Sequence, residues 1–290
     1  MRKKICLAVY LLFILMLIPA YSFAAINLNI SNSTTTIIDS STFKMNNITA
    51  DIDGVSVPGQ YWIDFKWDSV NLVFVPINVG AELNYKTSEY LPLGQGDTWT
   101  VLHDGVEYDT VTVSGTEKID SVIASKMMTA DGSYQLLTSD NNGIRIYKQY
   151  EVKDSGWSQM IFSPPGSYVP GEVSIGKTYT GTSTLYYTNS EGGSITGPAS
   201  VEVTVKGTEN VTVPAGTFKD CLKLGIKRNL SSSDGKDASL YDGTLWLAKG
   251  VGKVKETATT IEKENGVVVK VNPDTDELVS ANVGGVGYPK

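Results

Sequence analysis

One histidine and one cysteine are the residues of this chain best suited to metal or nucleophilic chemistry. His103 is the only histidine among 290 residues. Cys221 is one of two cysteines, and the other, Cys6, lies near the N-terminus. Zinc sites take three or four ligands, mostly Cys and His, so His103 and Cys221 would need carboxylates to complete one. His103 precedes Asp104-Gly105, a dipeptide typical of a hairpin turn, and is expected to be a solvated turn histidine.

Cys221 ends the stretch VTVPAGTFKDC, which begins at Val211. Pro214 cannot donate to a strand ladder and Gly216 can take a positive φ, so these residues indicate the corner of a hairpin. Beyond the corner Cys221 lies among apolar residues, where burial disfavours the thiolate. We expect a structural thiol rather than a reactive one.

Other routes to chemistry find little support in the sequence. We expect no G-x-S-x-G elbow, no P-loop and no G-x-G-x-x-G motif before a helix. Two carboxylates across a cleft suffice for glycoside hydrolysis, but the sequence singles out no pair. Calcium ligands could come from the acidic stretches 51–54 and 272–277, although neither fills an EF-hand loop and Asp and Asn are ordinary turn residues. We therefore predict no catalytic, cofactor-binding or metal residue, and no enzyme activity.

The chain is dominated by runs rich in Val, Ile, Thr, Tyr and Trp that alternate with period two. Short clusters of Gly, Ser, Asn and Asp separate these runs, which is the pattern of strands joined by turns. The connections are too short for helical crossovers. The fold class is therefore predicted as all-β and mostly antiparallel.

Residues 25–88 are predicted to form a small β module. Its run QYWIDFKWDSVNLVFVP alternates so that Tyr61, Ile63, Phe65 and Trp67 share one face. This face is interpreted as the core of a small module, with an aromatic sugar-binding surface as the alternative. Trp62 is the one aromatic residue on the opposite, polar face, and is the candidate ligand-facing residue.

Residues 89–290 contain two matched blocks in the same order. A Y-x-P…G-x-T-aromatic-T pattern occurs at 90–100 and again at 168–180, and VTVSGTEKI at 111–119 matches VTVKGTENV at 203–211. We predict a duplicated antiparallel meander, with copies at about 90–167 and 168–260, that forms a curved sheet or half-barrel. The Gly-rich ending NVGGVGYPK is expected to be a loose tail.

Three further stretches stand within about residues 89–260: YLPLGQGDTWT, VTVPAGTFKDCLKL and GTLWLAKGVGKVKE. Together they resemble a bacterial envelope family, the DUF3108-like proteins. The resemblance implies a secreted or lipid-anchored protein whose antiparallel half-barrel is similar to that of the lipoprotein carriers of the outer-membrane pathway. It further implies a curved sheet that could hold an apolar ligand, and it implies no functional residues.

The N-terminus has the parts of a secretory signal. A basic cluster at residues 2–4 precedes an apolar stretch at 5–18, and small residues follow. Cleavage after Ala24 is predicted, giving a signal peptide at 1–24, with an uncleaved anchor as the alternative. No cysteine follows the apolar stretch, so no lipobox is expected. We predict a secreted or periplasmic protein with no stable membrane span after cleavage.

Loss of the three basic residues and no acid takes the formal net charge from −7 to −10, which disfavours nucleic-acid partners. These observations favour a non-catalytic envelope protein without a cofactor. It would bind an apolar small molecule or an envelope protein on a curved β-sheet. A carboxylate-dependent hydrolase on a β scaffold and a sugar-binding module are the alternatives.

Overall fold

The computed structural model describes residues 26–29, 34–38, 42–52, 55–68, 70, 73–82 and 84–289. Regular structure in these ranges is strand apart from one 3₁₀ turn, η3 (Thr87–Glu89), which confirms the predicted all-β class. The chain divides into two compact units, with the boundary between Tyr85 and Lys86. Within the described ranges, no helix is long and apolar enough to cross a membrane.

The first unit is a five-stranded antiparallel sheet. Its strands are β1 (Ile26–Asn29), β2 (Thr34–Ile37), β3 (Thr42–Ile52), β4 (Val55–Asp68) and β5 (Val73–Glu82). The sheet has the order β1-β3-β4-β5, with β2 also on β3.

The aromatic hairpin predicted in this unit is formed by β4 and β5. Their register begins at Asp68↔Val73. The rings of Phe43 and Phe65 stack with centroids 5.0 Å apart, but Trp67 is 38% exposed, so the aromatic face is only partly covered. Trp62 lies in β4, and its side chain falls outside the described part of the structure, as does the predicted signal segment 1–24.

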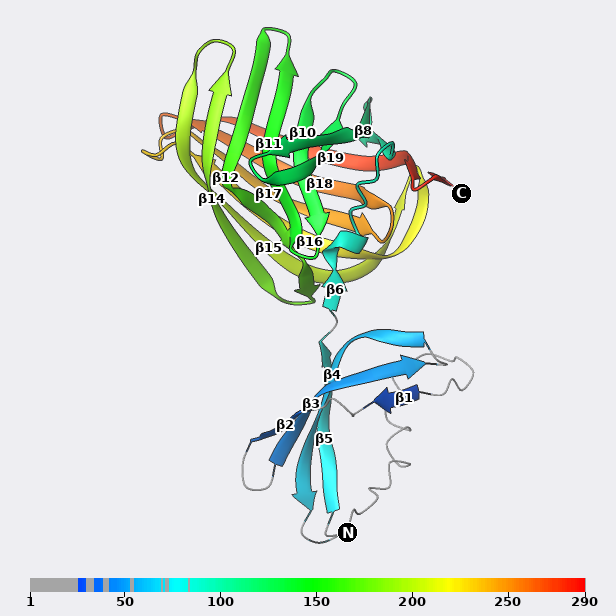
Figure 1. Ribbon diagram of the computed structural model, residues 1–290. Coiled ribbons are helices and arrows are strands. Elements are labelled where there is room, and N and C mark those ends of the chain that lie inside the picture. The colour runs from blue at the N-terminus through cyan, green and yellow to red at the C-terminus, as the bar shows by residue number, and fades with distance from the viewer. Residues whose placement is uncertain are drawn as a thin grey trace. The chain divides into compact units, whose positions relative to one another are not determined.

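The second unit is a closed antiparallel barrel of twelve strands, β7–β12 and β14–β19 (Figure 1). The strands from β6 onward are β6 (Asn84–Lys86), β7 (Thr98–His103), β8 (Glu107–Ile119), β9 (Val122–Met128), β10 (Tyr134–Asp140), β11 (Gly143–Lys153), β12 (Gly156–Pro170), β13 (Glu172–Ser174), β14 (Thr178–Asn189), β15 (Ser194–Val213), β16 (Gly216–Ser231), β17 (Ala238–Ala248), β18 (Gly252–Glu264), β19 (Val267–Val283) and β20 (Val286–Tyr288).

The predicted half-barrel is wrong because β19 closes the sheet. One edge of β19 pairs with β18 and the other pairs with β7, through contacts that include Asp276↔His103. Pairing both edges leaves no open edge, so the predicted concave face becomes the inside of a barrel.

The expectation of a loose C-terminal tail is also wrong, because Gly284 and Gly285, with φ of 57° and 79°, turn the chain so that β20 pairs with β19.

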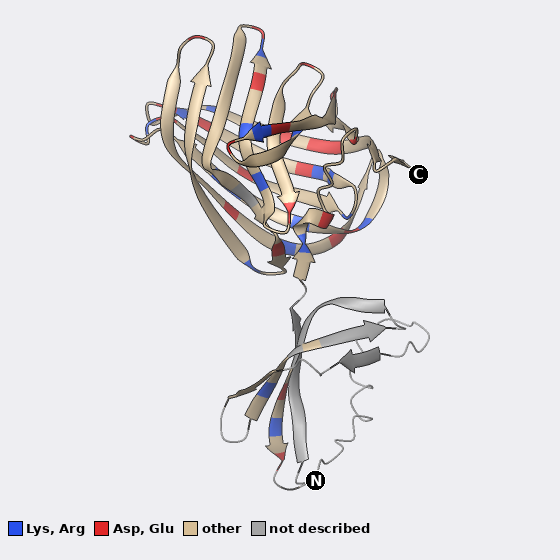
Figure 2. Ribbon diagram, viewed as in Figure 1, with Lys and Arg blue, Asp and Glu red and all other residues tan. Residues whose placement is uncertain are grey.

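Side-chain alternation separates the inside of the barrel from its outside. Val203 of β15 lies opposite Ile226 of β16, and both are buried, whereas the next row, Glu202 and Lys227, is exposed. Because a closed barrel covers its inner face, the buried rows mark the side that we call the lumen face. Figure 2 shows acidic and basic residues interspersed along the barrel strands.

The VTVPAGTF stretch is the corner of the β15–β16 hairpin, as predicted, and it contacts the closing strand. The Ala215 amide donates a hydrogen bond of 2.9 Å to the carbonyl oxygen of Leu278 in β19. Val213 and Cys221 belong to a buried cluster that includes Trp99 and Leu278. The corner therefore connects the β15–β16 hairpin to the strands that close the barrel.

Trp99 offers a test of this cluster. Its indole N–H donates a hydrogen bond of 2.6 Å to the Val251 carbonyl in a buried setting. We expect Trp99→Phe to lower the free energy of unfolding by about 2–3 kcal/mol in urea titrations, because ring volume is lost and a buried carbonyl loses its donor. The control is Trp246→Phe, because Trp246 packs against the same cluster but its indole N–H bonds Glu209 at an exposed position, with an expected loss of about 1 kcal/mol or less. Equal losses of unfolding free energy for the two variants would contradict the special role of the buried Trp99–Val251 hydrogen bond.

Candidate functional site

A row of polar and charged side chains crosses five neighbouring strands on the lumen face of the barrel. The register places Arg228 of β16 opposite Tyr241 of β17, and places Glu256 of β18, Asp276 of β19 and His103 of β7 side by side. Strand alternation puts Tyr241 on the same face as Glu256. We call these residues, together with Lys253, the lumen row.

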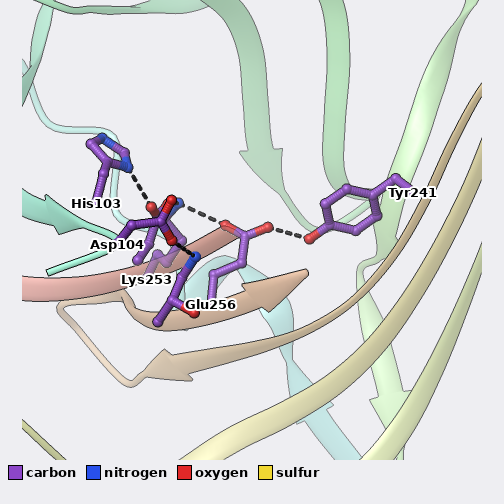
Figure 3. Close-up of polar contacts among 7 residues, drawn as sticks. His103, Asp104, Tyr241, Lys253 and Glu256 are labelled. Atoms are coloured by element: carbon purple, nitrogen blue, oxygen red, sulfur yellow. Dashed lines mark hydrogen bonds and ion pairs between the residues drawn. The ribbon is translucent and has the colours of Figure 1, made fainter. Parts of the chain in front are cut away.

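Lys253 is the bridge in the middle of the lumen row. Its Nζ lies 2.7 Å from Glu256 Oε2 and 2.5 Å from Asp276 Oδ2. The second oxygen of each carboxylate has another partner, since Tyr241 donates its hydroxyl to Glu256 Oε1 and His103 Nδ1 pairs with Asp276 Oδ1. Figure 3 shows His103 and Tyr241 at opposite ends of one continuous chain of contacts.

The pKa shifts in this chain are set by competition between burial and opposite charges. Burial disfavours the charged form of Lys253, but Glu256 and Asp276 outweigh burial and raise the lysine pKa. Burial also acts to raise the pKa of Asp276, but Lys253 and His103 outweigh it and the pKa is lowered. Asp276 therefore stabilises the fold above its unfolded pKa of about 3.9, and this contribution is lost as the pH falls through its lower folded value.

The lumen row is partly accessible to solvent. The side chains of Lys253 and His103 retain 35% and 36% exposure, whereas that of Asp276 retains 6%. Side chains on the inner face of a closed barrel keep this exposure only where the interior is not filled, so the barrel is open to water at this level. Gly243 makes room for the row, because a Cβ at this position would lie 2.5 Å from the Tyr241 hydroxyl.

Asp274 lies beside the lumen row, two residues before Asp276 on the same face of β19. Its side chain makes no hydrogen bond or ion pair with any described residue. Burial raises its pKa, and repulsion from Asp276, Asp104 and Glu256 raises it further, against the opposing effect of His103. Ligand atoms of His103, Asp274 and Asp276 all lie within 4.8 Å of one another.

The expectations for these acidic and histidine residues need correction. The stretch 272–277 is not a turn but the middle of β19, because the chain turns earlier, at Asn265 and Gly266, with φ of 51° and 81°. His103 does end its strand before a turn, but its ring pairs with Asp276 instead of standing free in solvent. Asp51 lies in β3, and residues 53–54 fall outside the described ranges.

Cys221 belongs to the buried cluster around Trp99 and not to the lumen row. Burial raises the pKa of its thiol to about 11. The thiolate is therefore scarce at neutral pH, which agrees with a structural thiol.

A match to a phosphate-binding loop, which the sequence was not expected to contain, occurs at residues 171–178, GEVSIGKT. The functional motif needs a helix behind the loop and free backbone amides. Here the loop leads into strand β14, and the amides of Gly176 and Lys177 already donate to Val205 and Ser174. The match therefore supplies no phosphate cradle.

An apolar cavity of about 40 Å³ lies next to Arg228. Its lining includes Ile146, Phe162, Ala199 and Leu230, and three of these belong to a buried cluster of the barrel together with Leu185. A second depression, of about 500 Å³, is lined from the same strands by residues that include Thr180, Thr182, Leu240, Thr259 and Ile261. By register these five point away from the lumen face.

Arg228 carries the one charge that lines the apolar cavity. Its guanidinium lies 5.2 Å from the ring centroid of Tyr241, a cation–π contact. No described carboxylate lies within ion-pair distance of it. An arginine in such a place is a ready donor for an anionic group.

The sequence indicated only part of this site. His103 and the stretch 272–277 were singled out, whereas Arg228, Tyr241, Lys253 and Glu256 were not. Arg228, Tyr241 and Glu256 give one weak local signal, a polar group whose neighbours two residues away are apolar or small, and Lys253 lacks even this because Lys255 follows it. The pairing of distant strands was needed to bring them together.

The DUF3108-like family matches residues 177–267, a segment that runs from the start of β14 into β19. The matched segment is similar to the DUF3108-like family. The match contains the VTVPAGTFKDCLKL and GTLWLAKGVGKVKE stretches, and it confirms the resemblance there. Arg228, Tyr241, Lys253 and Glu256 lie inside the DUF3108-like segment, whereas His103, Asp274 and Asp276 lie outside it.

Three solved structures are similar to the chain. A candidate lipoprotein from Parabacteroides distasonis is 14% identical, with a TM-score of 0.38 over 66% of this chain and 97% of its own. A candidate exported protein with a YmcC-like fold from Bacteroides fragilis is 15% identical, with a TM-score of 0.37 over 66% and 98%. The hypothetical lipoprotein YmcC from Escherichia coli is 10% identical, with a TM-score of 0.37 over 67% and 88%. No curated protein sequence matches the chain.

Removal of the Lys253 cation tests the lumen row. In EDTA-containing buffer at pH 7, we expect Lys253→Met to lower the free energy of unfolding by about 3 kcal/mol or more, because two carboxylates lose their shared partner. The loss should shrink as the pH falls below about 4, where the carboxylates take up protons. The control is Lys255→Met, which breaks a pair with Glu277 on the outer face and should cost about 1 kcal/mol or less. A pH-independent loss would contradict the electrostatic account.

Proposed function

We propose that this chain is an exported, non-catalytic envelope protein whose barrel binds a small apolar ligand that carries an anionic group. The observation that supports the proposal best is the place of Arg228, a cation without a carboxylate partner at the wall of an apolar cavity. Export is supported by the basic, apolar and small-residue order of the first 24 residues.

The chemistry around Arg228 defines the ligand class. Apolar side chains of Ile146, Phe162 and Leu230 can hold a hydrocarbon group, while the guanidinium can hold a carboxylate or phosphate through charge-assisted hydrogen bonds. A cavity of about 40 Å³ has room for roughly three water-sized groups. The ligand part inside it is therefore short, such as the first carbons of an acyl chain.

A non-catalytic role is favoured over the carboxylate-dependent hydrolase. A hydrolase of that kind needs two acids on either side of a substrate. Glu256 and Asp276 are both bound to Lys253, so neither is free to act on a substrate. The sugar-binding alternative rests on Trp62 in the first unit and has no support from the described side chains.

Substitution of Arg228 tests the anionic part of the proposal. With sodium decanoate as the probe in isothermal titration, we expect Arg228→Gln to weaken binding about tenfold, because a charge-assisted hydrogen bond is lost. Binding of decanol, which has the same chain without the charge, should be unchanged. The matched control is Lys227→Gln, the same charge change on the outer face next to Arg228.

Two outcomes would overturn this proposal. One is the absence of decanoate and decanol binding to the wild-type protein, and the other is an equal effect of the Arg228 and Lys227 substitutions on decanoate binding.

Native mass spectrometry of protein purified from the envelope fraction adds an independent measure of ligand binding. It would report a co-purified ligand and, from the polypeptide mass, whether the chain begins at Ala25.

We also propose that the barrel contains a duplicated meander. Support comes from matched geometry at the matched blocks. The Gly96 and Gly176 amides donate to Val113 and Val205, at 2.9 and 2.8 Å, and these valines donate back to the residues after the two glycines. In each block the strand register then shifts two residues after the valine, between Val113 and Gly115 in the first block and between Val205 and Gly207 in the second.

The two bulge glycines provide a test of this equivalence. Gly115 and Gly207 have φ of 147° and 133°, and neither has a heavy atom within 4 Å of an added Cβ. Gly115→Ala and Gly207→Ala should therefore lower the free energy of unfolding by similar amounts, about 1–2 kcal/mol each, through backbone strain. Gly287→Ala, at an open position without positive φ, is the control with little effect. If the stability losses of Gly115→Ala and Gly207→Ala differ by more than about 1 kcal/mol, the two positions are not equivalent.

A further inference from the structure

A cluster of one imidazole and two carboxylates lies where β7 and β19 meet on the lumen face. Ligand atoms of His103, Asp274 and Asp276 lie within 4.8 Å of one another. We propose that these three residues bind one divalent transition-metal ion of the zinc type. This site does not depend on Arg228 or on the apolar cavity, so it goes beyond the ligand-binding function proposed above.

The cluster has an excess of negative charge. Asp276, Asp104 and Glu256 each lie close enough to the partly buried Asp274 to repel its negative charge. One lysine, Lys253, faces them among the described residues. With His103 neutral, the group carries a formal charge of −3. A divalent cation would offset most of this charge, and a partly buried position makes that attraction stronger than in water.

Asp274 gives an independent indication of a missing partner. It is the one carboxylate of the group that makes no hydrogen bond or ion pair with a described residue, whereas Asp104 accepts the Thr275 amide at 2.9 Å. Opposite Asp274 in the register stands Ala258, and beyond it Gly243. The small Ala258 side chain places no bulky group directly opposite Asp274, while the Tyr241 hydroxyl lies over Gly243.

Asp276 is already oriented as a ligand. Lys253 holds Oδ2 at 2.5 Å, and the other oxygen, Oδ1, faces His103. A partner that fixes one carboxylate oxygen while the other meets the metal is a common arrangement around metal sites. Metal binding would replace the contact of Asp276 with the imidazole, and any proton on the coordinating nitrogen would leave as the ion binds.

The ligand set defines the kind of ion. Imidazole suits zinc and other first-row transition metals, whereas calcium and magnesium prefer oxygen ligands alone. Three protein ligands leave at least one coordination position for water. The site therefore fits a borderline divalent ion such as Zn²⁺ better than Ca²⁺ or Mg²⁺.

The test uses the EDTA-treated, dialysed protein with Zn²⁺ and Ca²⁺ as probes in isothermal titration and thermal unfolding. We expect one Zn²⁺ per chain, a rise in melting temperature with Zn²⁺, and a much weaker response to Ca²⁺. His103→Gln and Asp274→Asn should each weaken Zn²⁺ binding at least tenfold. Asp274→Asn removes a repelled charge, so the metal-free variant should stay folded and be no less stable than the wild type.

The matched control is Asp242→Asn, which removes one carboxylate from the outer face and should leave Zn²⁺ binding unchanged. The proposal is overturned if the wild type binds no Zn²⁺, if it binds Ca²⁺ as tightly as Zn²⁺, or if either ligand variant keeps wild-type affinity. Decanoate binding through Arg228 is measured separately, so failure of one proposal is distinguishable from failure of the other.

Discussion

The double pairing of β19 is the constraint on which the rest of the barrel depends. With β18 on one edge and β7 on the other, every barrel strand has a neighbour on each side, so the barrel has no edge strand for another chain to join. Closure also creates the lumen, because a face that would be open in a half-barrel becomes enclosed on all sides. The pairing of β19 with β7 also brings His103 into the lumen row beside Asp276.

The free-energy cost of burying charges inside the barrel is offset by ion pairs and hydrogen bonds among the charged groups. Lys253 meets two carboxylates, and each carboxylate meets a second donor, Tyr241 or His103. A buried charge is costly alone and tolerable in a satisfied network. Asp274 stands outside this network, and for that reason it and its neighbours support a cation site, while Arg228 supports an anion site on the apolar side.

Sequence patterns predicted the strands and the corner at Pro214–Gly216, because alternation and turn chemistry are local properties. They could not predict closure of the barrel, because closure depends on the pairing of β7 with β19, where residues such as His103 and Asp276 lie 173 positions apart in the chain. The same limit applied to the site. Asp274 and Asp276 were interpreted as turn residues because Asp and Asn favour turns, whereas the ladder with β18 holds them in a strand. Lys253 and Glu256 gave too little local signal to be singled out, since their partners on other strands are set by the register of the strands.

The position of the closing strand in the chain has a consequence for how the protein is made. β7 is synthesised well before β19, so the barrel cannot close until all the strands between them have left the ribosome. Until then β7 and β18 present unpaired edges, which are prone to join other strands. Contacts between residues so far apart also slow folding. We expect the nascent chain to require protection from aggregation until β19 has paired with β7.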